Sequence, residues 1–177
     1  MTLSQNQSAP HPLYHPTCLR RKLCIPFSDI PNFSRVEDHL RQMVSNEMDG
    51  RCIAEGFIKP GSCVLRSHSI GALSAGNIRF DLDVDCMLCC PKDGAVINCI
   101  AKTVTQAGIR AHACMSPSPV VIYISREMHD AVRHGPVPMP MDSIKPGDTM
   151  QIRVVGKRFE LNDKHVSVIG ELINEFN

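Results

Sequence analysis

Alternating apolar and polar residues recur along most of the chain, and this pattern predicts a protein built mainly from β-strands. In the run 77–90 three apolar and three acidic residues alternate: Phe80, Leu82 and Val84 with Asp81, Asp83 and Asp85. Period-two alternation buries one face of a strand and leaves the other in solvent. Shorter runs at 51–58 and 62–70 precede it, and apolar residues occupy every second position at 23–27. The residues 71–76, between two of these runs, are expected to form a loop.

One segment has helical rather than strand periodicity. The apolar residues of its single stripe are Val36, Leu40, Met43 and Val44. Ser34 precedes the stripe and Glu37 follows three residues later, which is the pattern of a capping box. Gly50 comes after the last turn, as is usual at the end of a helix. We therefore predict a helix over 35–48.

The second half of the chain predicts a β-barrel. Five apolar-rich runs are separated by turn residues, at 95–104, 108–114, 119–124, 149–159 and 164–172. A short helical run at 125–132 lies between the third and the fourth, which is the element order of an OB-fold barrel. We therefore expect an α+β protein with a flexible N-terminal arm at 1–17, a first domain at 18–93 and a five-stranded OB-fold domain at 94–177.

The composition limits the ways in which the protein can bind its partners. The chain has 177 residues, with 19 Lys and Arg against 18 Asp and Glu, so its formal net charge is +1. Hydrophobic residues make up 43%, which is ordinary globular usage and excludes a disordered chain, a coiled-coil rod and a collagen. The balanced charge excludes binding of nucleic acid by bulk electrostatics. Binding to nucleic acid must therefore come from a local patch.

The cysteines indicate a reducing compartment. The chain has nine, an odd number, and the N-terminal run MTLSQNQSAPHPLYHP lacks the apolar core of a signal peptide. No run reaches the ~18 apolar residues of a membrane span, so we expect an intracellular protein without membrane contact. Cys86, Cys89 and Cys90 suggest a zinc site, but residues three apart on a strand face opposite sides and no second C-x-x-C follows. We therefore predict structural thiols, no metal and no cofactor.

The three aspartates of the first half form a second candidate metal site. An EF-hand loop would need Gly at its sixth position and Glu at its twelfth, where the chain has Cys86 and Lys92. A metal-dependent enzyme using Asp81, Asp83 and Asp85 remains an alternative, although strand alternation alone accounts for them. The sequence contains no nucleophile–base motif and no phosphate-binding loop. We therefore expect a binding protein rather than an enzyme.

The outer wall of the predicted barrel supplies candidate RNA-binding residues. Alternation within the strands turns most apolar residues inward and leaves basic, polar and aromatic residues outside. The same alternation places the apolar Val121 outside as well. OB-folds bind single strands through such walls, because cations contact phosphates and rings stack on bases. The candidates are Lys102, Arg110, His112, Tyr123, Arg153 and Lys157. An ordinary solvated wall would show the same pattern.

Several local phrases resemble one known family. They are GRCIAEGFI after the helix, DVDCMLCCPKDGAVINCIAKTVTQAGI across the domain junction, then VVIYISREMH and GDTMQIRVVGKRFELNDKHVSVIGEL. With this order of elements the chain resembles the stalk subunit of RNA polymerase II, its seventh subunit, together with archaeal and large-DNA-virus relatives. The resemblance covers residues 23–177, while the N-terminal arm and the Pro- and Met-rich loop before the fourth barrel strand depart from the family pattern.

The resemblance implies a ribonucleoprotein-like tip domain at 18–93, which docks on the polymerase near the RNA exit channel, and an OB domain that contacts nascent single-stranded RNA. It also implies the large polymerase subunits and a small helical stalk partner as partners, and a nuclear location, or a viral factory or virion if the protein is viral. A tip of this size has little core of its own. We therefore expect Val36, Leu40, Met43 and Val44 to dock on a partner. A free-standing OB-fold RNA-binding protein, of exosome-cap or translation-factor type, is the alternative.

Overall fold

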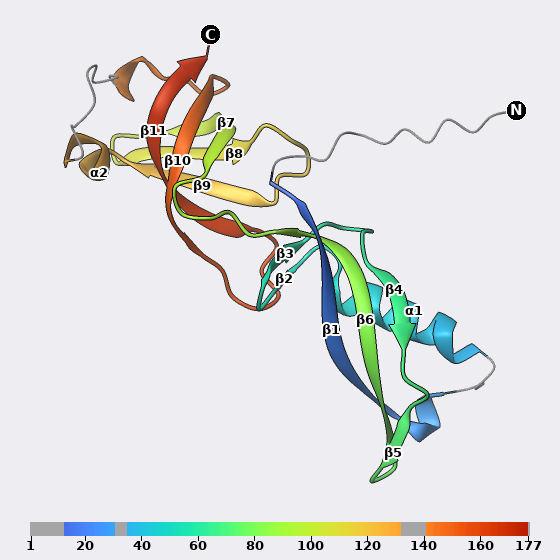
Figure 1. The fold of residues 1–177 in the computed structure, drawn as a ribbon. Coiled ribbons are helices and arrows are strands. Elements are labelled where there is room, and N and C mark those ends of the chain that lie inside the picture. The colour runs from blue at the N-terminus through green and yellow to red at the C-terminus, as the bar shows by residue number, and fades with distance from the viewer. Residues whose placement is uncertain (1–12, 31–34, 132–140, 177) are drawn as a thin grey trace, which may run out of the picture. The chain divides into compact units, whose positions relative to one another are not determined.

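The structure, a computed structural model, describes residues 13–30, 35–131 and 141–176. The chain divides into two compact units (Figure 1). The first contains the described residues up to Arg51 together with Ile58–Cys89, and the second contains Cys52–Phe57 and the described residues from Cys90 onward. The short segment Cys52–Phe57 therefore belongs with the second unit, although the sequence grouped it with the first.

The first unit is a sheet with one helix. Strands β1 (His15–Pro26) and β6 (Asn77–Cys89) pair antiparallel over their whole length. Strands β4 (Val64–His68) and β5 (Ala72–Ser74) also pair with β6. Helix α1 (Val36–Met48) contacts β4 and buries Leu40 and Val44. Alternation along β1 and β6 buries further core residues, among them Leu19, Leu23, Ile25, Phe80, Leu82 and Val84.

The predicted helix is confirmed. Arg35 occupies the N-cap position and makes no side-chain capping bond, while Ser34 lies outside the described residues. The helix ends before Gly50, which adopts a φ of 71°. The left-handed backbone that follows a helix is available to glycine without steric cost.

The start of the chain differs from the sequence expectation. Strand β1 begins at His15, and Leu13 and Tyr14 before it are buried. The last five residues of the expected arm at 1–17 therefore belong to the core and to β1, while residues 1–12 lie outside the described part. Phe27, expected to close the first strand, begins the 3-10 turn η1 (Phe27–Asp29) and is 53% exposed. Pro26 explains the break, because it has no N–H with which to continue a ladder.

Two further segments contain more strands than the sequence pattern predicts. The expected strand at 51–58 is a hairpin of β2 (Cys52–Ile53) and β3 (Gly56–Ile58). The expected loop at 71–76 contains β5, which pairs with the start of β6. The strands β2, β3 and β5 have only two or three residues each, so pairing with a neighbour rather than local periodicity makes them strands.

The second unit is a closed five-stranded barrel, consistent with the predicted OB-fold (Figure 1). Its strands are β7 (Val96–Val104), β8 (Gly108–Ala113), β9 (Val120–Ser125), β10 (Thr149–Arg158) and β11 (Val166–Phe176). They close in the order β10-β11-β9-β8-β7, with β9 and β11 parallel. Helix α2 (Arg126–Ala131) follows β9, and the 3-10 turn η3 (Met141–Ser143) precedes β10. The predicted five-stranded barrel is confirmed, and the described residues form mainly strands with few helices.

The barrel interior follows the predicted alternation, with one exception on β9. Its buried residues include Ile109, Ala111, Ala113, Val120, Ile122, Ile124, Met150, Ile152 and Val154. Val121 was expected to face solvent but is only 4% exposed. Its cross-strand neighbours His112 and Ser167 are also only partly exposed, so this end of the outer wall is shielded from solvent.

Gly108, at the start of β8, allows the backbones of β8 and β9 to come close. Its φ is 154°, and a Cβ at this position would overlap the carbonyl oxygen of Ile124. A side chain here would therefore push the start of β8 away from the end of β9, and these two strands carry Arg110 and Tyr123. Among the described residues, no helix is both long and apolar enough to cross a membrane.

Candidate nucleic-acid interface

Arg110 and Tyr123 lie directly opposite each other on β8 and β9. Both side chains are exposed, Tyr123 to 44%. Directly opposed residues on an antiparallel pair have Cβ atoms about 4.5–5.5 Å apart, so a cation and a ring occupy one patch. Lys102 lies in the irregular stretch of β7 between Ala101 and Thr103, and Thr103 is opposite Arg110. Three neighbouring strands thus bring Lys102, Arg110 and Tyr123 together.

His112 lies next to this patch, and the positive charges of the patch affect its pKa. It lies two residues beyond Arg110 on β8 and is partly exposed. Burial lowers the pKa of the imidazole from its ordinary value of 6.5, and the charges of Arg110 and Lys102 lower that pKa further, with a smaller effect from His165. Both influences favour the neutral ring at neutral pH. His112 therefore adds a neutral imidazole, not a cation, to the patch at pH 7.

An apolar strip continues from Tyr123 across the barrel wall. Ile169 on β11 is opposite Tyr123 and is 45% exposed. On β10 the next exposed apolar residue is Val155, which lies in the bulge opposite this part of β11. Exposed apolar side chains next to a ring provide a flat surface for a nucleobase. Ile169 is not among the residues predicted from the sequence, although the inward alternation of Val166, Val168 and Leu172 around it indicates its outward side.

Arg153 and Lys157 do not join the patch. Arg153 on β10 forms an ion pair with Glu171 of β11, with 3.5 Å between Nη1 and Oε2. Lys157 Nζ donates a hydrogen bond of 2.8 Å to the carbonyl oxygen of Pro91. Each cation is therefore satisfied within the unit and is a weaker phosphate contact than Arg110 or Lys102, for which the structure gives no ion pair.

The four residues expected to dock on a partner divide into two pairs. Leu40 is fully buried and Val44 is 4% exposed, so the core of the first unit takes up both side chains. Val36 and Met43 are partly exposed and remain accessible on α1. We therefore restrict the docking prediction to Val36 and Met43. Core burial of Leu40 and Val44 follows from the helix stripe facing the sheet of its own domain.

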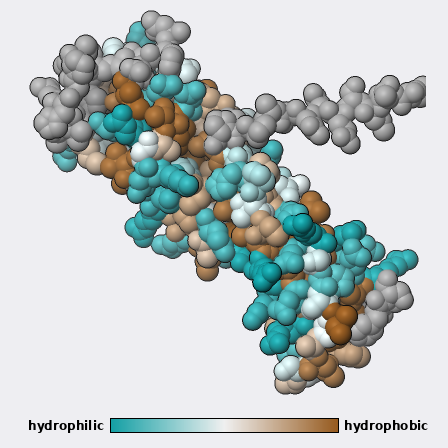
Figure 2. Space-filling view, in the orientation of Figure 1, coloured by the Kyte–Doolittle hydropathy of each residue, from teal (hydrophilic) through white to brown (hydrophobic). Residues whose placement is uncertain are grey.

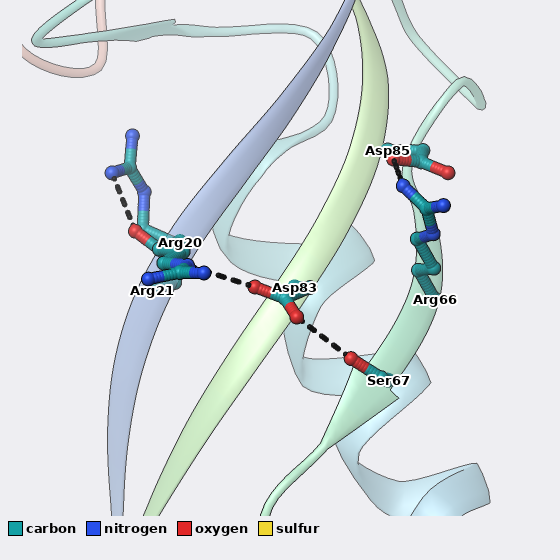
Figure 3. A network of polar contacts seen from close by, with 6 residues as sticks. All are labelled: Arg20, Arg21, Arg66, Ser67, Asp83 and Asp85. Carbon is teal, nitrogen blue, oxygen red and sulfur yellow. Dashed lines mark hydrogen bonds and ion pairs between the residues drawn. The ribbon is translucent and has the colours of Figure 1, made fainter.

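Two of the three aspartates of β6, Asp83 and Asp85, face basic and hydroxyl side chains on the adjacent strands (Figure 3). Arg20 Nε of β1 lies 3.4 Å from Asp83, whose other oxygen accepts a 2.8 Å hydrogen bond from the Ser67 hydroxyl. Arg66 Nη1 lies 4.0 Å from Asp85. In Figure 2 hydrophilic side chains predominate over this part of the first unit. Cations and hydroxyl groups thus take the positions next to these carboxylates that a metal ion would need.

A shallow hollow of about 530 Å³ lies on the same sheet. Its lining combines cations, carboxylates, hydroxyls and an imidazole: Arg20, Arg21, Lys22, Ser67, His68, Ser69, Asp81, Leu82 and Asp83. Within the described ranges, no group of three or more His, Cys, Asp or Glu side chains could hold a metal ion. The aspartates are therefore arranged as the polar face of a sheet.

The buried cysteines have the environment of structural thiols. Cys86 and Cys89 are buried within the strand β6. Burial is also the main influence that raises the pKa of Cys52 to about 11 and that of Cys99 to about 12. A thiol must lose its proton to bind zinc or to act as a nucleophile. These two thiols are protonated at neutral pH and behave as small apolar side chains.

No protein-family model matches the chain, and no curated protein sequence matches it. Evidence about function therefore comes from the side chains of the barrel wall. This wall offers two cations, one exposed phenol ring and an adjoining apolar strip, contributed by the five strands of the barrel. Such a set binds a flexible polyanion with planar bases better than a small metabolite, since the surface is open and extended.

Proposed function

We propose that this protein is a non-catalytic stalk subunit of a multisubunit DNA-directed RNA polymerase, and that its barrel contacts nascent single-stranded RNA. The observation that carries the RNA-binding part is the opposition of Arg110 and Tyr123 on β8 and β9. These are the second and third strands of the barrel, and the corresponding wall of an OB-fold is where oligonucleotides bind.

In this proposal the RNA backbone runs across β7 and β8 while its bases lie over β9 and β11. Lys102 and Arg110 contact phosphates, and the ring of Tyr123 stacks on a base, with Ile169 extending the surface. Neither type of contact reads base identity, because all bases have stacking faces and all nucleotides carry the same phosphate. The protein would guide a transcript of any sequence, as a subunit near an RNA exit channel must.

The first unit is proposed to be the tip domain that docks on the polymerase core. Support comes from its separate sheet and helix, and from the partly exposed Val36 and Met43 on α1. The family resemblance supplies the identity of the partners, namely the large polymerase subunits and a small helical stalk protein.

Two measurements test the proposal separately. Titration of the full chain with fluorescent single-stranded RNA tests the wall, and the Arg110→Ala/Tyr123→Ala double variant should lose most of the affinity. The matched control is Arg153→Ala, which removes a cation already paired with Glu171 and should change affinity little. Unchanged binding in the double variant would overturn the RNA-binding role.

Affinity purification of the tagged chain from its native cells tests the stalk assignment. Recovery of large polymerase subunits in stoichiometric amounts is expected. RNA binding by the wall together with an absence of polymerase subunits would replace the stalk assignment with that of a free-standing RNA-binding protein.

A further inference from the structure

Strand β1 forms a long and regular edge of the first unit's sheet. It has 12 residues and, among the residues that the structure describes, it pairs with β6 and with no other strand. The pairing with β6 runs from His15 to Pro26 without a register shift, so the edge has no β-bulge. The only prolines of β1 are Pro16 and Pro26, close to its two ends. Bulges and central prolines are two of the means by which edges resist a further strand, and β1 has neither; charged side chains are a third, and on β1 these are Arg20 and Lys22.

The backbone groups that face outward can be identified from Arg21. Its Nη1 donates a 3.2 Å hydrogen bond to the carbonyl oxygen of Arg20, on the side of β1 away from β6 (Figure 3). The N–H and C=O of one strand residue point to the same side, and the side alternates along the strand. Arg20 therefore directs its backbone groups outward, and so do Cys18, Lys22 and Cys24.

The side chains of β1 define what a further strand would have to carry. Arg20 and Lys22 are exposed on the polar face of the sheet, while Leu19, Leu23 and Ile25 are buried on the other face. The ion pair of Arg20 with Asp83 leaves the Arg20 side chain 93% exposed, so its guanidinium can contact a second carboxylate. Lys22 is opposite Asp81 in the ladder and is also open to solvent on its outer side.

We propose that the outer edge of β1 binds an extended acidic segment of a partner protein, which adds a strand to the sheet. The segment would alternate apolar residues, placed beside Leu19 and Leu23, with Asp or Glu residues, placed beside Arg20 and Lys22. Main-chain hydrogen bonds to the outward groups would supply affinity, and the cations would select for carboxylates. The inference does not rest on RNA binding, because β1 and the barrel belong to different units.

A second copy of this chain is a poorer occupant of the edge than an acidic segment. Antiparallel pairing of two β1 edges centred on Arg21 would set Arg20 of each copy opposite Lys22 of the other. Like charges directly opposite each other on neighbouring strands are destabilising, whereas opposite charges add stability. The basic pair thus works against self-association and in favour of an acidic strand.

The test uses the full chain and a short end-blocked peptide in which valine and glutamate alternate. Binding is measured by calorimetry, and amide hydrogen exchange is followed at single-residue resolution. In the free protein the amides of Cys18, Arg20, Lys22 and Cys24 should exchange quickly, while those of the residues between them are held by β6. Saturation with the peptide should slow exchange at the first set.

Matched variants separate strand addition from simple charge attraction. The Arg20→Gln/Lys22→Gln variant should bind the peptide roughly tenfold more weakly, because two cross-strand charge pairs are lost. Lys92→Gln, which removes one exposed cation from a turn outside β1, is the control and should leave binding unchanged. The same peptide N-methylated at every second residue cannot complete the ladder and should not bind.

Three results would overturn the proposal. The first is peptide binding that leaves exchange at the four outward amides unchanged. The second is protection of those amides that rises with protein concentration in the absence of peptide, which would mean that a second copy occupies the edge. The third is protection by single-stranded RNA rather than by the peptide, which would make the basic residues of β1 a phosphate site.

Discussion

Arg110 and Tyr123 face each other across β8 and β9, and both side chains are exposed on the barrel wall. Lys102 and Ile169 flank them on β7 and β11. Four side chains from four strands therefore form one surface with a cationic side and an apolar side.

Removing Arg110 should weaken RNA binding without changing base preference. Each phosphate contact releases counterions, so Arg110→Ala should reduce the slope of log K against log salt by roughly one unit. Fluorescence anisotropy with several RNA sequences at a series of salt concentrations measures both quantities. An unchanged salt slope would show that Arg110 makes no phosphate contact.

Removing the ring of Tyr123 should lower RNA affinity by about 1–3 kcal/mol, the usual value of one base stacked on an aromatic side chain. Tyr123→Phe keeps the stacking face and should retain nearly full affinity. Because the ring is 44% exposed, Tyr123→Ala should change the free energy of unfolding only slightly. Equal losses in the Phe and Ala variants would point to the hydroxyl instead of the ring.

Lowering the pH should strengthen RNA binding through His112. The pKa of this group lies below its ordinary value of 6.5, so the imidazole gains a proton, and a charge near Arg110, only below that pH. Affinity measured between neutral and mildly acidic pH should rise in the native chain, and the rise should shrink in His112→Gln. His165→Gln is the control, since His165 also influences the pKa of His112.

The same shift has the opposite effect on stability. The folded pKa of His112 lies below that of the unfolded chain, so protons bind preferentially to the unfolded state. The contribution of the neutral His112 ring to the free energy of unfolding is fully present above the pKa that the group has in the unfolded chain. This contribution is lost as the pH falls below about 6.5. Denaturant unfolding of the native chain and of His112→Gln at several pH values checks this sign.

Leu40→Ala should destabilise the first unit and leave the barrel intact. The side chain is fully buried, and such truncations cost about 2–5 kcal/mol because they leave a cavity. Amide exchange should increase in β1, β4 and β6 but not in β7 to β11. Met43→Ala, on the partly exposed side of α1, should have a much smaller effect on stability. Similar stability losses for the two variants would contradict their assignment to core and surface.

Gly108→Ala should destabilise the barrel. The added methyl group would overlap the carbonyl oxygen of Ile124, and the backbone φ of 154° is unfavourable for alanine. Overpacking of this kind costs about 1–3 kcal/mol. Thermal unfolding followed by circular dichroism measures the loss. RNA affinity should also decrease, because Gly108 and Arg110 lie on the same strand. Gly147→Ala, where a Cβ would meet open space, is a control for backbone strain alone.

Local periodicity determined most of the elements. The stripe containing Leu40 and Val44 predicted α1, and the alternation around Ile122 and Met150 predicted β9 and β10, because the side chains of helices and strands repeat with periods of 3.6 and 2. Order along the chain was enough to suggest a five-stranded barrel with a helix after its third strand. These features depend only on residues close together in the sequence.

Cross-strand neighbours were decided by the tertiary structure. The sequence proposed Lys102, Arg110, His112, Tyr123, Arg153 and Lys157 as one equivalent set. Register brings the first four together, while Glu171 and the carbonyl oxygen of Pro91 take up Arg153 and Lys157. The parallel pairing of β9 with β11 is what adds Ile169 to the surface. Periodicity along one strand carries no information about which residue of another strand lies opposite.

Burial on the outer wall and at the edges also required the folded chain. Val121 has the alternation of an exposed residue yet lies on a shielded end of the wall, and Leu13 and Tyr14 are buried although their neighbours in sequence are polar. The sequence set which side of its own strand each residue takes, since that depends on backbone geometry alone. The tertiary structure decided whether solvent or another part of the same unit meets that side, because packing joins segments that are distant along the chain.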